Sequence, residues 1–274
     1  MRVIDAQIHL WARETSNRRW PEYGRSYAHG QELLAEQVIS RMDEAGVDAA
    51  ILVPPSWEGD RNDVCLDAAI RYPDRFAVMG RFPIEVATER DQLETWRQQT
   101  GMLGVRLTFH NRFQKAWLRD GTADWFWSEA ERLQIPLMLF VPDSLDEIAG
   151  IAKRFPGLKL ILDHLALFGT YDDQLIPQLD PTLALARFPN IAVKSSCMPN
   201  LVSEDYPFPT LIEAIQRVVG VFGPERTFWG SDVSRLRCSW RESRALFTDE
   251  CSFLSSGDLE WIMGRGIREW LRWE

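Results

Sequence analysis

The chain has 274 residues, 45% of them hydrophobic, with a formal net charge of -9 at pH 7 and a pI near 5.1. This length suits one large α/β domain or two small ones, each with a sizeable core. The acidic balance offers no positive field to nucleic acid or to an anionic membrane surface, so neither is expected as a partner.

Neither targeting nor cysteine patterns suggest a secreted or membrane protein. The chain does not start with a basic segment followed by a long apolar run, and no later apolar stretch approaches the roughly 18 residues that span a bilayer. We therefore expect a cytoplasmic protein. The cysteines lie far apart without a C-x-x-C pair, which favours reduced thiols over a disulfide framework or a structural zinc site.

Short runs rich in β-branched and apolar residues recur along the chain and predict eight strands. These runs cover residues 3–9, 49–55, 76–82, 102–109, 136–142, 158–164, 191–196 and 226–232. Helical spacing is found between them, at residues 33–47, 65–73, 124–133, 145–155 and 211–222. Buried strands alternating with helices predict a parallel sheet, and eight repeats favour a (β/α)8 TIM-type barrel, regular or distorted. No linker composition divides the chain, so we expect one domain over residues 1–274.

In such a barrel, the loops after the strands form the active-site face. The longer ones are expected at 10–30, 108–122 and 197–210. Polar residues end several otherwise apolar strands. Burying an unpaired polar group costs about 2–7 kcal/mol, so such residues are expected either to pair with one another or to serve a functional site. These residues are Gln7, His9, Arg106, Asp163, His164, Lys194 and Asp232.

The first strand ends in the sequence VIDAQIHLW, in which Gln7 lies two residues before His9. Residues two apart in a strand point to the same side, so the two side chains share one environment. A His-x-His pair there would indicate a metal site. Gln-x-His does not, because a neutral amide is a poor replacement for imidazole on a transition metal.

Taken together, several motifs resemble the amidohydrolase superfamily, and specifically the amidohydrolase-2 branch that includes 2-pyrone-4,6-dicarboxylate lactonase and sugar lactonases. The resemblance covers nearly the whole chain, and the ILDHL and WGSD elements are its most specific parts. The motifs are IDAQIHLW, RNDVCLDAAIRYPDRFAVMG (61–80), GVRL (104–107), RFPGLKLILDHLALFG (154–169), RFPNIAVKSS (187–196) and FGPERTFWGSD (222–232).

The resemblance places a divalent ion of the metal-binding members at the positions of Gln7, His9, His164 and Asp232. Gln7 departs from that ligand set, the fifth predicted strand carries no histidine, and Arg106 stands where some relatives have a bridging lysine. A fixed cation repels a metal ion. We therefore expect no metal cofactor; if one is bound, it is a single zinc or other divalent ion at His9, His164 and Asp232.

The lactonase branch implies hydrolysis of a small, carboxylated lactone or related ester without a metal. Asp232 would take a proton from the attacking water. His9, His164 and Arg106 would stabilise the oxyanion. Gln7 would donate to a carbonyl oxygen or orient His9. Arg106 could instead be a buried ion-pair partner.

Further residues are candidates for binding the small-molecule substrate. Lys194 is expected to bind a carboxylate or to form a structural salt bridge. His110 and Arg112, after the fourth predicted strand, could reach an acidic substrate. Trp57 is a candidate wall of the pocket. His29, in the first long loop, is a candidate at its mouth.

Two other functions remain open from the residues alone. One is a metal-dependent hydrolase or non-oxidative decarboxylase with an ion at His9, His164 and Asp232, which suffice for an open catalytic zinc site. The other is an inactive barrel that binds a metabolite or a protein partner. A homodimer is compatible with either. Asp163 is expected to be structural, because strand alternation points it away from His164.

Overall fold

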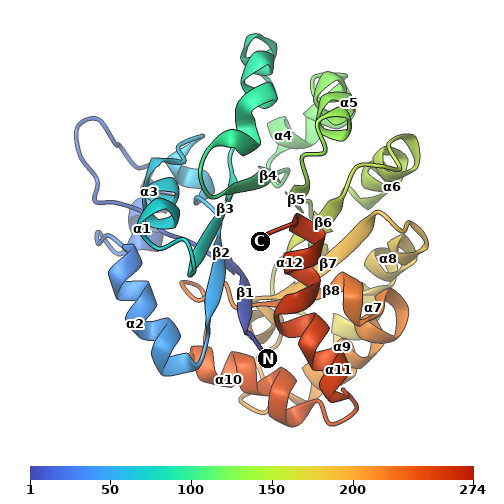
Figure 1. Ribbon diagram of the computed structural model, residues 1–274. Coiled ribbons are helices and arrows are strands. Elements are labelled where there is room, and N and C mark those ends of the chain that lie inside the picture. The colour runs from blue at the N-terminus through green and yellow to red at the C-terminus, as the bar shows by residue number, and fades with distance from the viewer.

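The computed structural model describes residues 1–274 and shows eight parallel strands in one sheet, in the order β1 to β8. Figure 1 shows the strands at the centre of the molecule with the helices around them. Each predicted strand is confirmed, and each observed strand lies within its predicted range. The strands are β1 Ile4–Ile8, β2 Ala49–Leu52, β3 Phe76–Gly80, β4 Met102–Thr108, β5 Leu137–Phe140, β6 Leu160–Leu162, β7 Ile191–Ser196 and β8 Thr227–Gly230.

Apolar strand residues fill both faces of the sheet, which explains the continuous apolar runs in the sequence. In β2, Ala49 and Ile51 belong to the cluster inside the barrel, whereas Ala50 and Leu52 belong to the larger cluster beneath the helices. All four are fully buried. Both packing layers of a (β/α)8 barrel are therefore present.

The helices follow the predicted spacing at all five expected positions, and further ones occur where no helix was expected. A 3₁₀ segment, Ala87–Gln98, connects β3 to β4, and three helices follow β8. The helices are α1 Glu22–Ala28, α2 Ala35–Ala45, α3 Asp63–Arg71, α4 Arg112–Trp117, α5 Asp124–Arg132, α6 Leu145–Arg154, α7 Leu175–Gln178, α8 Asp180–Leu183, α9 Pro209–Phe222, α10 Trp240–Ala245, α11 Ser256–Glu260 and α12 Gly266–Leu271.

The barrel closes between β8 and β1 through a buried side chain. The strand ladders run from β1–β2 through to β7–β8. At the seam, Asp5 accepts hydrogen bonds from the backbone N–H groups of Gln7 and Ser231 and from the Trp240 indole, at 2.8–3.0 Å. Burial raises the pKa of Asp5 to about 6, although these donors oppose the shift. The barrel is thus distorted at this seam.

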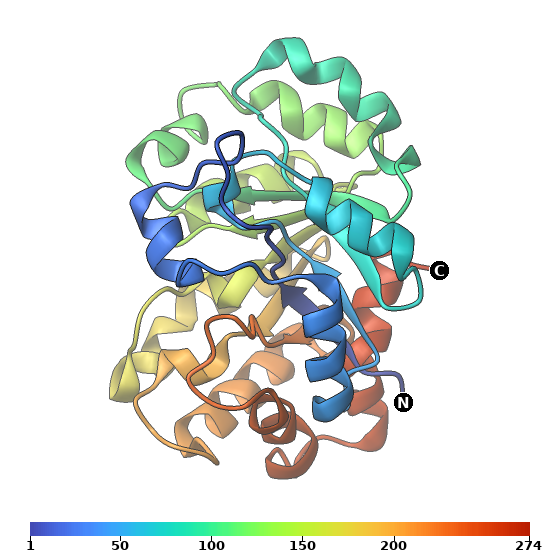
Figure 2. The same cartoon turned by 90° about the vertical axis from the view of Figure 1, so that its left-hand side faces the viewer.

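The two ends of the barrel differ in what covers them. Ile267 and Leu271 of α12 pack on the cluster inside the barrel, and Figure 2 shows both chain termini on one side of the molecule with α1 on the other. None of the helices combines the length and the hydrophobicity that a bilayer-spanning segment requires. Helix α12 closes the end from which the strands start, so the opposite end remains available for a site.

Candidate active site

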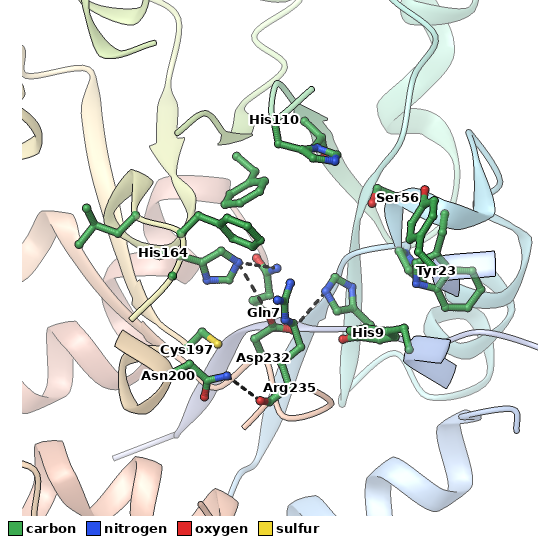
Figure 3. A pocket seen from close by; sticks show the side chains of 18 of the residues that line it. Gln7, His9, Tyr23, Ser56, His110, His164, Cys197, Asn200, Asp232 and Arg235 are labelled. Atoms are coloured by element: carbon green, nitrogen blue, oxygen red, sulfur yellow. Dashed lines mark hydrogen bonds and ion pairs between the residues drawn. The ribbon is translucent and has the colours of Figure 1, made fainter. Parts of the chain in front are cut away.

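A cavity of about 710 Å³ lies at the carboxyl ends of the strands. Figure 3 shows side chains from several strand ends and loops pointing into it. All three of the expected long loops contribute to its wall, with Tyr23 from the first, His110 from the second and Asn200 from the third. The carboxyl ends of barrel strands are where active sites of this fold lie.

Most of the predicted site residues are brought together here. Gln7, His9, Arg106, His164 and Asp232 line the cavity, as do His110 and Trp57. Three others do not line it. Lys194 is fully buried within the barrel, whereas Arg112 and His29 are exposed outside the cavity, at the starts of α4 and of the turn after α1.

Three strand ends hold cavity residues in left-handed backbone geometry. His164 after β6 has φ 53°, Cys197 after β7 has φ 56°, and Asp232 after β8 has φ 54°. Leu165 and Ala166 continue the turn after β6 with φ 56° and 57°. This conformation costs a non-glycine residue roughly 1–2 kcal/mol. The packing of the barrel therefore holds these turns in an unfavourable geometry that directs His164 and Asp232 into the cavity.

Asp232 is a buried carboxylate at the floor of the cavity. Its Oδ1 atom lies 3.1 Å from His9 Nε2, and its Oδ2 atom lies 3.8 Å from His164 Nε2. Burial favours the neutral acid, but the positive charge and contact of His9 outweigh it and hold the pKa of Asp232 well below its usual range. Oδ1 nevertheless lacks a well-directed hydrogen-bond donor. Asp232 is thus ionised, with Oδ1 buried against His9 and with Oδ2, which accepts no hydrogen bond within the protein, available to a donor in the cavity.

His9 is oriented by the backbone of the neighbouring strand. Its Nδ1 atom lies 2.5 Å from the carbonyl oxygen of Val53. Because a carbonyl oxygen only accepts hydrogen bonds, Nδ1 carries a hydrogen and Nε2 faces Asp232. The ring is therefore fixed with one nitrogen toward the carboxylate, as Figure 3 shows.

Gln7 contacts His164 rather than His9, which differs from the expectation that it would orient His9. Lys194 donates to Gln7 Oε1, so the amide nitrogen must point the other way, and it lies 3.4 Å from His164 Nε2. Only a lone pair on that Nε2 can accept from the amide, which leaves the hydrogen on Nδ1, 2.8 Å from Ser196 Oγ. Burial lowers the pKa of His164 to about 4, so the ring is neutral.

Asp163 links the two cations beneath the cavity. Its carboxylate lies 2.8 Å from Lys194 Nζ and 3.1 Å from Arg106 Nε. Burial favours the neutral acid, but the charges of Lys194 and Arg106 outweigh it and lower the pKa of Asp163. Arg106 is thus both a buried ion-pair partner and a cavity residue. Lys194 forms a structural salt bridge, which is one of the two roles predicted for it.

Several cavity residues were not singled out from the sequence. Arg235 follows Asp232 on the same loop, and its guanidinium lies 5.9 Å from the Tyr27 ring centroid and 5.7 Å from that of Phe168. Some belong to the expected long loops and the rest lie at or after the ends of other strands, and this placement is the only signal that could have indicated them. The others are Tyr23, Ser26, Pro55, Ser56, Thr108, Phe140, Leu167, Gly169, Thr170, Cys197, Asn200 and Leu201.

The side chains present do not fit a metal ion. The Gln7 amide directs its N–H at His164 Nε2, the atom that would have to bind the ion, and Lys194 fixes this orientation. The N–H end of the amide, which carries partial positive charge, therefore points to the place where a metal ion bound to His164 would lie. No group of three or more His, Cys, Asp or Glu side chains is arranged to hold a metal ion.

The fold is a parallel eight-stranded barrel, and an ionised carboxylate lies close to two imidazoles at the carboxyl ends of its strands. This combination of fold and site is that of an enzyme. The family model described as Amidohydrolase (Amidohydro_2) matches residues 4–272, so the chain belongs to this amidohydrolase family.

Similar proteins include an L-fucono-1,5-lactonase of Burkholderia ambifaria, 24% identical over 241 residues that cover 85% of this chain and 81% of that protein. The structure of an amidohydrolase from Burkholderia multivorans with bound zinc has a TM-score of 0.83 at 18% identity, covering 99% of both chains. That of a probable 2-pyrone-4,6-dicarboxylic acid hydrolase from Acinetobacter baumannii, with citric acid bound, has a TM-score of 0.77 at 20% identity, covering 99% of this chain and 100% of the other.

Proposed function

We propose that this protein hydrolyses a small lactone or related ester that carries a carboxylate, without a metal ion. The observation that carries the proposal is Asp232, a buried ionised carboxylate that lines the cavity, with Oδ1 held against His9 and Oδ2 accepting no hydrogen bond within the protein. The lactonase activity named for the Burkholderia ambifaria relative supports the same reaction type.

In the proposed reaction, water donates a hydrogen bond to Asp232 Oδ2 and attacks the lactone carbonyl carbon while its proton passes to Asp232. The tetrahedral intermediate then collapses, the ring C–O bond breaks, and the ring oxygen leaves with the proton held by Asp232. The product is an open-chain hydroxy acid. All atoms balance without a further reactant.

The oxyanion needs hydrogen-bond donors, and the cavity provides them from two sides. Arg106 Nη2 has no partner within the protein. Both nitrogens of His9 are engaged, Nδ1 with the Val53 carbonyl oxygen and Nε2 with Asp232, so His9 positions Asp232 instead. His164, expected to share this role, accepts from Gln7 in the resting site. We therefore assign His164 to holding Gln7, whose second amide N–H is available to the carbonyl oxygen.

The test is turnover by wild type and the Asp232→Asn variant on L-fucono-1,5-lactone and on pyrone carboxylates, before and after chelation. We expect chelator-resistant hydrolysis by wild type and a loss of at least about 1,000-fold in kcat for Asp232→Asn, with an unchanged circular dichroism spectrum. Activity that disappears on chelation and returns with zinc would contradict the metal-free proposal.

A further inference from the structure

Arg81 is a buried arginine without a carboxylate partner. It follows β3 directly, is 7% exposed, and makes no ion pair. Asn62 fixes its backbone on both sides, since the Asn62 side chain accepts from Arg81 N at 2.7 Å and donates to Arg81 O at 3.0 Å. A buried guanidinium without an anion is costly, so its retention in this position calls for a partner.

The hydrogen-bond donors around Arg81 outnumber the acceptors. Both of its terminal nitrogens lie near Thr108 Oγ1, at 3.3 and 3.2 Å, and Arg106 Nη1 donates to the same oxygen at 2.6 Å. A hydroxyl oxygen has two lone pairs, so it cannot satisfy three N–H groups. Arg81 Nε has no partner at all. The two guanidinium groups thus converge on a position that lacks acceptor atoms.

A small cavity adjoins this position. It has a volume of about 140 Å³ and is called the side pocket here; Arg81 lines it. Ser56 and Thr108 line both the side pocket and the main cavity. A ligand in the main cavity can therefore present one group toward Arg81.

Arg81 and Arg106 repel each other at this side of the mouth. Burial lowers the pKa of Arg81 to about 9, and repulsion from Arg106 adds to the shift. Burial also lowers the pKa of His110, and the charges of Arg106 and Arg81 lower it further. Asp60 and Glu85 line the side pocket too; the charge of Asp60 offsets part of the shift, but neither carboxylate forms an ion pair with Arg81. An anionic group would relieve this repulsion.

We propose that Arg81, beside Thr108, forms a carboxylate subsite that selects lactones carrying a carboxylate remote from the reacting carbonyl, to which Arg106 Nη2 remains available. Guanidinium groups bind carboxylates through paired N–H donors, which is the ligand chemistry that the free donors match. The subsite lies on β3 and β4, across the barrel from Asp232 on β8. In Figure 3, His110 likewise lies apart from the cluster of His9, His164 and Asp232.

This inference rests on the proposed function for its substrate class, but its binding step can be tested separately from turnover. Coumalate, a 2-pyrone with a carboxylate at ring position 5, and its methyl ester form a matched pair that differs in charge. Calorimetric titration of coumalate into Asp232→Asn and into Asp232→Asn/Arg81→Met measures the subsite in proteins that do not turn the pyrone over.

We expect Kd for coumalate to rise by about 30- to 100-fold on the Arg81→Met change, as for loss of a buried charge-assisted pair, and Kd for methyl coumalate to change by less than about 2-fold. Arg81→Lys should recover part of the affinity. Arg97→Met is the matched control, because Arg97 lies at the outer end of the 3₁₀ segment and only donates to the Gln134 carbonyl.

Three results would overturn the subsite. They are equal affinity of Asp232→Asn and Asp232→Asn/Arg81→Met for coumalate, an equal loss of affinity for coumalate and for its methyl ester, and no measurable binding of coumalate to Asp232→Asn. Thermal melting of each variant establishes that it is folded. Turnover is measured separately with wild type and Arg81→Met. If binding depends on Arg81 but no lactone is hydrolysed, the subsite stands and the proposed reaction fails.

Discussion

The two sides of the cavity mouth differ in how their charged groups are paired. On the β8–β1 side, charge is neutralised: Asp232 lies against His9, and a neutral His164 accepts from the Gln7 amide. On the β3–β4 side, two guanidinium groups share one hydroxyl oxygen. A carboxylate whose charge is balanced by its neighbours suits a proton acceptor in the reaction, whereas a site with surplus donors suits an anion that arrives with the ligand.

Asp163 connects the two sides, because it pairs with Lys194 below Gln7 and with Arg106 below Thr108. Replacing Asp163 by Asn leaves two buried cations without their anion, and we expect it to lower the free energy of unfolding by about 3–5 kcal/mol. Urea unfolding at pH 7 measures the loss. The control is Asp180→Asn, which breaks the exposed pair with Arg217; a loss as small as that of this control would contradict the coupling.

The pH dependence of stability sharpens the description of the β8–β1 side. Burial lowers the pKa of His164 from its usual value of 6.5 to about 4, so the unfolded chain gains the proton first as pH falls. The stabilisation from a neutral His164 is therefore complete above pH 6.5 and lost between pH 6.5 and about 4, a change of about 3 kcal/mol. Urea unfolding across this range should show a steeper decline for wild type than for His164→Asn. An equal decline of the free energy of unfolding with pH in the two proteins would contradict this role of His164.

Gln7→Leu tests whether the amide serves the reaction rather than the carboxylate subsite. The change removes the donor to His164 and the acceptor of Lys194, so we expect kcat for lactone hydrolysis to fall by about 100-fold. Coumalate affinity, measured in the Asp232→Asn background, should change by less than about 3-fold. A large loss of affinity with unchanged kcat would reverse the roles of the two sides.

The smallest expected effect concerns Asp60, which lines the side pocket near Arg81. Removing its charge with Asp60→Asn eliminates repulsion toward a bound carboxylate, so coumalate should bind about 2- to 3-fold more tightly. The gain should shrink at high salt, because Asp60 is exposed. Weaker binding would mean that Asp60 supports the ligand rather than opposing it.

Periodicity predicted the eight strands because each is apolar on both faces. The sequence left a distorted barrel open, but the place of the distortion escaped prediction because it depends on the side chain of Asp5. The β8–β1 cluster was predictable from strand-end motifs that place His9, His164 and Asp232 together. Arg81 was not, since one arginine after an apolar run is uninformative until Thr108 and Arg106 are seen beside it. The direction of the Gln7 amide likewise depended on Lys194, from a distant strand.

The left-handed turns after β6 and β8 imply a conflict between durability and function. His164 and Asp232 occupy backbone conformations that glycine adopts without strain, and Asp232 also holds a charge in a buried position. A chain with glycine at such a turn would relax the backbone yet lose the group that faces the ligand. Selection for heat tolerance alone would therefore favour the loss of both side chains. Their persistence in warm-adapted descendants would indicate that catalysis is being maintained.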